Sequence, residues 1–158
     1  MISAALILAA ATAPAPAADP LQPLSFLIGH CWRGEFKGSA KVDTHCFTPV
    51  YGGKHIRDVH EVTGGKDVYR GETLFSWNGE AKKVEFVYFN SLGGVSKGGM
   101  KPGVKEMIFD DESYVGQDGK TITFSTVWRR VGENGYEAVT KGANSGSGER
   151  VVRYTRVD

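Results

Sequence analysis

The stretch KTITFSTVWRRV, residues 120–131, indicates which kind of fold the chain adopts. Its bulkier and more apolar residues occupy every second position: Ile122, Phe124, Thr126 and Trp128. Side chains of a β-strand alternate between two faces with a period of two, whereas an amphipathic helix repeats every 3.6 residues. The stretch therefore predicts a strand whose even-numbered side chains face the protein core.

Runs of the same kind recur along the chain, separated by glycine-rich turns at intervals of about ten residues. KVEFVYFN (residues 83–90) and RVVRYTRV (150–157) are examples. This pattern is typical of an all-β sandwich or barrel. We favour a single antiparallel up-and-down β-barrel of about 8–10 strands, because closing the sheet removes exposed edges. One helical turn is expected, at PLSFLIG (23–29), where it would plug a barrel end.

The N-terminus has the character of an export signal. Its first 18 residues carry no charge, and the apolar core, residues 2–11, is shorter than the roughly 20 residues of a membrane span. We expect residues 1–17 to be a signal peptide, 18–28 a lead containing the plug, and 29–158 the barrel. A retained anchor is the alternative. The protein is expected to be periplasmic or secreted, with no transmembrane segment after cleavage.

Cys31 and Cys46 are the two cysteines of the chain. If residues 30–36 and 41–47 form a hairpin around KGSA (37–40), its register places Cys31 directly opposite Cys46. An exported protein meets an oxidising compartment, which favours a disulfide. The sequence therefore predicts a structural disulfide, with a redox or metal-binding thiol as the alternative.

Composition and motifs exclude several classes of function. The formal net charge of +1 arises from 19 basic and 18 acidic residues, and no basic block is present, so nucleic acid is not an expected partner. The sequence has no P-loop, HExxH or GxSxG motif, and no GxGxxG between a strand and a helix. No common nucleotide-binding or catalytic motif therefore points to a reaction.

Three segments carry a resemblance to known proteins: PLSFLIGHCWRGEF (23–36), GGKHIRDVHEV (52–62) and YRGETLFSWNGEAKKVEFVYFNSLGG (69–94). They resemble the opening and the third to fifth strands of calycin-like barrels, the lipocalin- and nitrobindin-related group that includes uncharacterised bacterial families. The resemblance implies a barrel with a central cavity, and in nitrobindin a haem held by a histidine near the C-terminus. No histidine follows residue 60 here, so we expect neither haem nor another cofactor.

The segment HIRDVHEV, residues 55–62, supplies the polar candidates for a site. Asp58 and His60 share one face of the expected strand, and this pair is the candidate for proton transfer. Arg57 points to the other face and, paired with Glu72, is the candidate for anchoring a ligand carboxylate. The alternative for both pairs is a salt bridge without a role in function.

A metal site is not expected from the histidines. His55 and His60 lie five residues apart, so they point to opposite faces of one strand. His30 and His45, with Asp43 nearby, would offer two imidazoles, but a usual site needs three or four ligands. The histidines are instead expected at the barrel rim or hydrogen-bonded inside it.

Aromatic residues of the inward faces are expected to form the core and to line a cavity. Small residues at Gly34, Gly71 and Thr126 are expected to leave room for a ligand. The predicted ligand-binding residues are Trp32, His45, Phe47, Arg57, Tyr69, Phe75, Trp77, Phe124 and Trp128.

Three functions remain open at this point. The first is binding of a small apolar or amphipathic molecule without transforming it. The second is acid-base isomerisation or hydrolysis with His60 and Asp58. The third is an envelope protein with a filled core whose outer face binds a partner. Fold analogy alone does not decide between them, because one barrel architecture hosts many activities.

Overall fold

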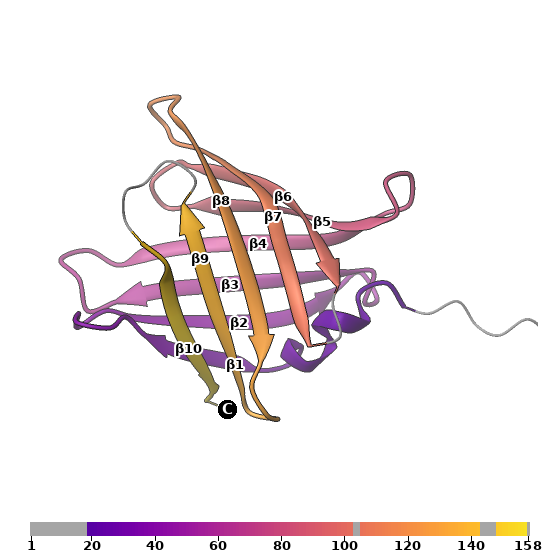
Figure 1. The fold of residues 1–158 in the computed structure, drawn as a ribbon, viewed down its shortest axis with the longest axis horizontal. Coiled ribbons are helices and arrows are strands. Elements are labelled where there is room, and N and C mark those ends of the chain that lie inside the picture. The colour runs from indigo at the N-terminus through magenta and orange to yellow at the C-terminus, as the bar shows by residue number, and fades with distance from the viewer. Residues whose placement is uncertain (1–18, 103–104, 143–147, 158) are drawn as a thin grey trace, which may run out of the picture.

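The computed structural model describes residues 19–102, 105–142 and 148–157, without the side chains of residues 110 and 111. They form a closed antiparallel barrel of ten strands, preceded by a short 3-10 helix (Figure 1). The strands follow one another around the barrel in sequence order, and β10 pairs with β1 to close it. The predicted all-β up-and-down barrel is confirmed. The expected signal peptide, residues 1–17, lies outside the described residues.

The bounds of the elements agree with the glycine-rich turns of the sequence. The 3-10 helix η1 spans Gln22–Leu27. The strands are β1 (Cys31–Glu35), β2 (Val42–Val50), β3 (His55–Thr63), β4 (Tyr69–Asn78), β5 (Lys83–Asn90), β6 (Val95–Pro102), β7 (Glu106–Val115), β8 (Thr121–Arg130), β9 (Gly135–Gly142) and β10 (Arg150–Arg156).

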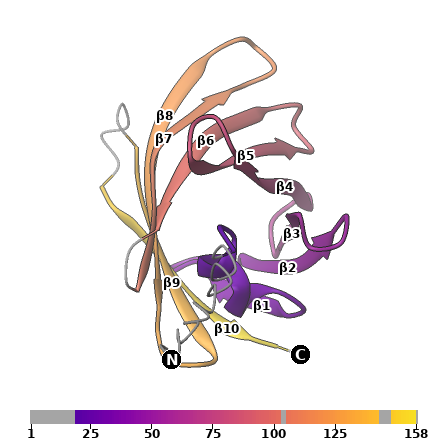
Figure 2. The same ribbon diagram turned by 90° about the vertical axis from the view of Figure 1, so that its right-hand side faces the viewer.

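The helix η1 closes one end of the barrel, as the sequence predicts. Leu24 and Leu27 are fully buried in the core, and the indole Nε1 of Trp32 donates a hydrogen bond to the Leu27 carbonyl at 3.3 Å. The ring of Phe26 packs edge-on against Trp32. Figure 2 shows η1 lying within the ring of strands. This packing fills the barrel interior next to η1. The interior toward the opposite end of the barrel is left to form the site.

The first hairpin has the predicted register. Cys31 pairs with Cys46 across β1 and β2, with a Cα–Cα distance of 4.1 Å, and the two form a disulfide. Trp32 and Gly34 of β1 are buried on the inner face, whereas the disulfide lies on the other face of the hairpin. The disulfide indicates an oxidising compartment. No helix in the described part of the chain has the length and apolar character of a membrane span.

Candidate functional site

The barrel contains a cavity of about 730 Å³. The packed core around η1 separates this cavity from the barrel end that η1 closes. The cavity reaches the barrel end opposite η1, where it is lined by Phe36 and Lys41 of the turn between β1 and β2 and by Arg150, the first residue of β10. The guanidinium of Arg150 lies over the Phe36 ring, 5.7 Å from its centroid. The cavity has two chemically different walls, one aromatic and one polar.

The aromatic wall comes mainly from β4 to β9, whose inward positions carry large rings. Trp128 is at its centre, with its ring centroid 4.9 Å from that of Phe109 and 6.1 Å from that of Phe75. The aromatic lining residues on these strands include Phe75, Phe86, Phe109, Phe124, Trp128 and Tyr136. The wall offers a flat apolar surface to the body of a ligand.

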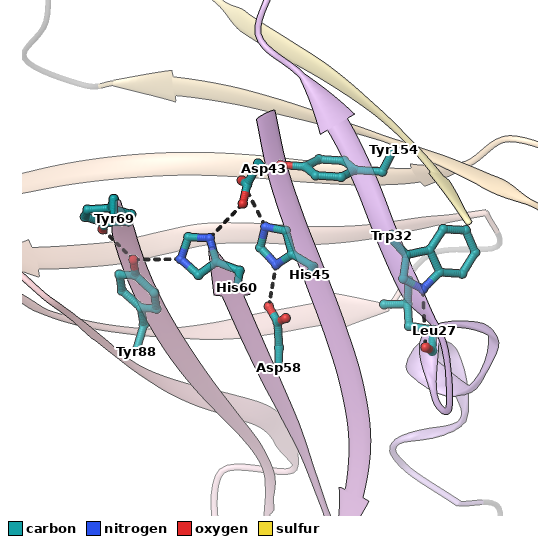
Figure 3. A network of polar contacts seen from close by, with 9 residues as sticks. All are labelled: Leu27, Trp32, Asp43, His45, Asp58, His60, Tyr69, Tyr88 and Tyr154. Atoms are coloured by element: carbon teal, nitrogen blue, oxygen red, sulfur yellow. Dashed lines mark hydrogen bonds and ion pairs between the residues drawn. The ribbon is translucent and has the colours of Figure 1, made fainter. Parts of the chain in front are cut away.

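The polar wall is built from strands β2 and β3, with additions from β4, β5 and β10 (Figure 3). Asp43 and His45 are inward positions of β2, and Asp58 and His60 are inward positions of β3. The β2–β3 register places His45 directly opposite His60, and their rings stack with centroids 4.5 Å apart and planes at 15°. Two imidazoles and two carboxylates therefore meet on one patch of the inner surface.

Asp43 is the centre of this network, although its side chain is only 7% exposed. Its Oδ1 lies 2.9 Å from Nδ1 of His60, and its Oδ2 lies 3.1 Å from Nε2 of His45. The hydroxyl of Tyr154 donates to Oδ2 at 2.9 Å. Burial alone would raise the pKa of Asp43, but the hydrogen bonds and positive charges of the two imidazoles outweigh burial and hold it far below its usual range. Asp43 is therefore a buried carboxylate.

His45 lies between two carboxylates. Its Nδ1 is 2.8 Å from Oδ2 of Asp58, while its Nε2 faces Asp43. Burial lowers the pKa of His45, but the charge of Asp58 and the hydrogen bonds to both carboxylates outweigh burial and raise it to about 10. His45 is thus an imidazolium at neutral pH. The other oxygen of Asp58, Oδ1, is buried and receives no hydrogen bond from the residues that the structure describes.

His60 connects Asp43 to two tyrosines. Its Nε2 lies 3.0 Å from the hydroxyl of Tyr88, which is in turn hydrogen-bonded to the hydroxyl of Tyr69. Burial raises the pKa of both phenols, so both carry their protons at neutral pH. A continuous chain of proton-bearing groups therefore runs from the buried Asp43 carboxylate through His60 to Tyr69 on the cavity wall.

These contacts correct the expected pairing of His60 with Asp58. The two residues share a face of β3, but His60 bonds Asp43 and Asp58 bonds His45. The β2–β3 register places His60 opposite His45 and Asp58 opposite Phe47, so both bonds run diagonally to a β2 residue two positions from the one directly opposite, a distance that these side chains can span. His60, and not His30 as considered from the sequence, is the second imidazole beside His45 and Asp43.

Four of the predicted ligand-binding residues do not line the cavity. Trp32 and Phe47 are buried beneath it in the core, with Phe47 packed edge-on against the aromatic wall. Arg57 makes the predicted pair with Glu72, through two hydrogen bonds of 2.8 Å, but on the exposed outer surface. Trp77, near the end of β4, is 41% exposed. The structure thus places Arg57 and Trp77 away from any ligand inside the barrel.

The other five predicted ligand-binding residues line the cavity: His45, Tyr69, Phe75, Phe124 and Trp128. Sequence reasoning missed Tyr88, Glu112 and Tyr154, which line it as well. Inward parity along KVEFVYFN was an available signal for Tyr88, since Phe86 and Tyr88 share a face. For Tyr154 the signal was weak, because its partner Asp43 is 111 residues away in the chain.

The small residues leave less room than expected. A Cβ at Gly71 would lie 2.3 Å from Nε2 of His60 and 2.4 Å from the Tyr88 hydroxyl, and a Cβ at Gly34 would lie 2.6 Å from Val152. The space at both glycines is filled by neighbouring side chains. Thr126 does line the cavity.

Neither the comparison with protein-family models nor the comparison with curated proteins finds a match to this chain. The functional conclusion therefore rests on the cavity and on the side chains that line it.

Proposed function

We propose that the protein is an exported, calycin-like barrel that binds a small amphipathic molecule in its cavity without transforming it. The cavity carries this proposal: its volume of about 730 Å³ is within the range of about 300 to 1,000 Å³ typical of small-molecule sites, and an aromatic wall faces a polar one. The disulfide and the barrel topology support a periplasmic or secreted location and the relationship to calycins.

The two walls suggest how such a molecule is held. Its apolar body packs on the rings around Trp128, and its polar group faces the hydroxyls of Tyr69 and Tyr88. These partly buried hydroxyls, already hydrogen-bonded to each other, can also donate to or accept from the ligand, and such placed polar groups fix its orientation. Entry is at the end lined by Lys41 and Arg150.

The proposal is tested with the neutral fluorophore N-phenyl-1-naphthylamine, which becomes bright in apolar surroundings. Thr126→Phe fills the cavity, whereas Ser125→Phe, one residue earlier on β8, places the same ring on the opposite face of the strand. We expect saturable binding to the unmodified protein, a loss of about tenfold or more in Thr126→Phe, equivalent to about 1.4 kcal/mol, and little change in Ser125→Phe. An absence of saturable binding, or equal losses in both variants, would contradict the proposal.

Native mass spectrometry of the protein purified from its own host gives an independent measurement. A mass above that of the chain that disappears on denaturation identifies a carried ligand. The same ligand should then displace the fluorophore. A displaced fluorophore supports the cavity as its site, and a carried molecule that leaves the fluorophore bound argues for another site.

An acid-base isomerase or hydrolase is the second candidate. The chain of hydrogen bonds from Asp43 through His60 and Tyr88 to Tyr69 favours it, because a proton can pass along such a chain to or from a molecule in the cavity. His60→Gln should abolish turnover of any molecule that the protein carries, and unchanged turnover would exclude this role. The third possibility, a partner-binding protein with a filled core, gains no support from a barrel with a cavity of this size.

A further inference from the structure

We propose that Asp43, His45 and His60 form a binding site for one divalent first-row transition-metal ion, on the cavity wall. The ligands all belong to the protein, so this inference does not depend on the amphipathic ligand proposed above.

The ligand atoms converge on one point between β2 and β3. One nitrogen of each imidazole faces the Asp43 carboxylate, Nε2 of His45 at 3.1 Å and Nδ1 of His60 at 2.9 Å, and one ligand atom from each residue lies within 4.8 Å of the others. Zinc binds nitrogen and carboxylate oxygen at about 2.0 to 2.2 Å, so a single ion can reach all three after small side-chain movements. Figure 3 shows the two rings side by side, both turned toward Asp43.

Each proposed ligand also forms a hydrogen bond with a side chain outside the set of three. The second nitrogen of His45 is 2.8 Å from Asp58, the second nitrogen of His60 is 3.0 Å from the Tyr88 hydroxyl, and Tyr154 donates to Asp43. Metal-ligating histidines nearly always donate their other N–H to a carboxylate, a carbonyl or another oxygen, which fixes the ring and the tautomer. In the metal-bound form Asp58 and Tyr88 accept from the outer nitrogens, and Nε2 of His45 and Nδ1 of His60 are free to coordinate.

The charge of the site favours a divalent cation. With an ion bound, both imidazoles are neutral, so the buried carboxylates of Asp43 and Asp58 give the four groups a formal charge of −2. Buried charge requires compensation, and Oδ1 of Asp58 has no hydrogen-bond partner among the described residues. A divalent ion neutralises the group. It takes the place of the proton on Nε2 of His45, which goes to solvent, while His60 holds a single proton on Nε2, the nitrogen that faces Tyr88.

The donor set also indicates the class of metal. Two imidazole nitrogens and one carboxylate oxygen suit zinc and its first-row neighbours, whereas magnesium and calcium prefer sites made of oxygen alone. Three protein ligands with a remaining open position are typical of metal sites that bind an exchangeable ligand. Asp43, His45 and His60 all line the cavity, so the open position faces it and is available to water or to a polar group of a bound molecule.

The test uses protein freed of metal by a chelator and titrated with Zn²⁺ in a calorimeter at neutral pH. We expect one Zn²⁺ per chain. His60→Gln should abolish binding, and His55→Gln should leave it unchanged, because His55 lies on the opposite face of β3 and bonds Ser76. Asp58→Asn, which weakens the partner of His45 without removing a ligand, should lower the affinity by about 10- to 100-fold.

A measurement on the unmodified protein keeps the test decisive if a variant fails to fold. Co²⁺ bound at the site should give visible absorption of a four- or five-coordinate ion and shifted proton resonances from two imidazoles. The absence of stoichiometric Zn²⁺ binding, full binding by folded His60→Gln, or shifted resonances from any histidine other than His45 and His60 would overturn the proposal. Fluorophore binding by the metal-free protein reports separately on the proposed ligand cavity, so the two proposals fail by different results.

Discussion

A single methyl group at Gly71 should disrupt the polar wall. Gly71, on β4, lies directly opposite His60 on β3. In Gly71→Ala the new Cβ would lie 2.3 Å from Nε2 of His60 and 2.4 Å from the hydroxyl oxygen of Tyr88. Real Cβ atoms do not approach neighbours so closely, so the His60 ring or the Tyr88 ring must move and their 3.0 Å hydrogen bond is lost.

Two effects set the size of the loss in stability. Forcing an extra methyl group into a well-packed interior costs about 1 to 3 kcal/mol, and losing a buried hydrogen bond costs about 1 kcal/mol more. We therefore expect the free energy of unfolding to fall by about 2 to 4 kcal/mol. At about 3 °C per kcal/mol for a chain of this size, the melting temperature should fall by about 6 to 12 °C.

Urea denaturation followed by circular dichroism measures this loss. Gly79→Ala, in the turn between β4 and β5, is the matched control, because the nearest heavy atom to its added Cβ is 3.9 Å away. We expect the control to remain within about 0.5 kcal/mol of the unmodified protein. A Gly71→Ala variant as stable as the control would refute the close packing of His60 and Tyr88 described above.

Two further predictions concern the disulfide and a buried acid. Replacing Cys31 and Cys46 by serine opens a loop of 15 residues and should lower the free energy of unfolding by about 3 kcal/mol; an unchanged urea midpoint would contradict this. Burial raises the pKa of Glu112 above 4.5, although the Ser96 hydroxyl, which donates at 2.8 Å, partly opposes the shift. The folded state therefore holds this proton more tightly, so the contribution of Glu112 to stability is full below pH 4.5 and is lost as pH rises through the folded pKa. Urea midpoints of unfolding should be measured from pH 4 to 8 for both proteins. The midpoint of Glu112→Gln should rise relative to that of the unmodified protein as pH rises, and a difference that stays constant with pH would contradict this prediction.

The fold was predictable because its determinants are local. Alternation in residues 120–131 and similar runs gave the strands, and the glycine-rich turns separated them. The register of the first hairpin followed from its short loop, which is why the Cys31–Cys46 pair was found. The position of η1 followed from an apolar run that begins with proline and precedes the first strand.

The candidate site was less predictable because it depends on pairing between strands. His45 meets His60 only through the β2–β3 register, set by a turn in which Tyr51 takes a positive φ of 52° that side chains rarely adopt. Parity identified the inward face of β3, yet it says nothing about which inward side chains of the next strand come close. Trp77 shares parity with Phe75 but lies near the strand end, where the inner face no longer buries it.

The closing pair of β1 and β10 has a consequence for the order of folding. The bond from Tyr154 to Asp43 joins the last strand to the second, so the polar wall is complete only after the C-terminal strand has docked. Contacts of such long sequence separation form slowly, and before they form, β1 and β9 present unpaired sheet edges. The Cys31–Cys46 hairpin needs only neighbouring residues and can form early. Until β10 is in place, the chain has its covalent cross-link but neither a continuous barrel nor a finished cavity.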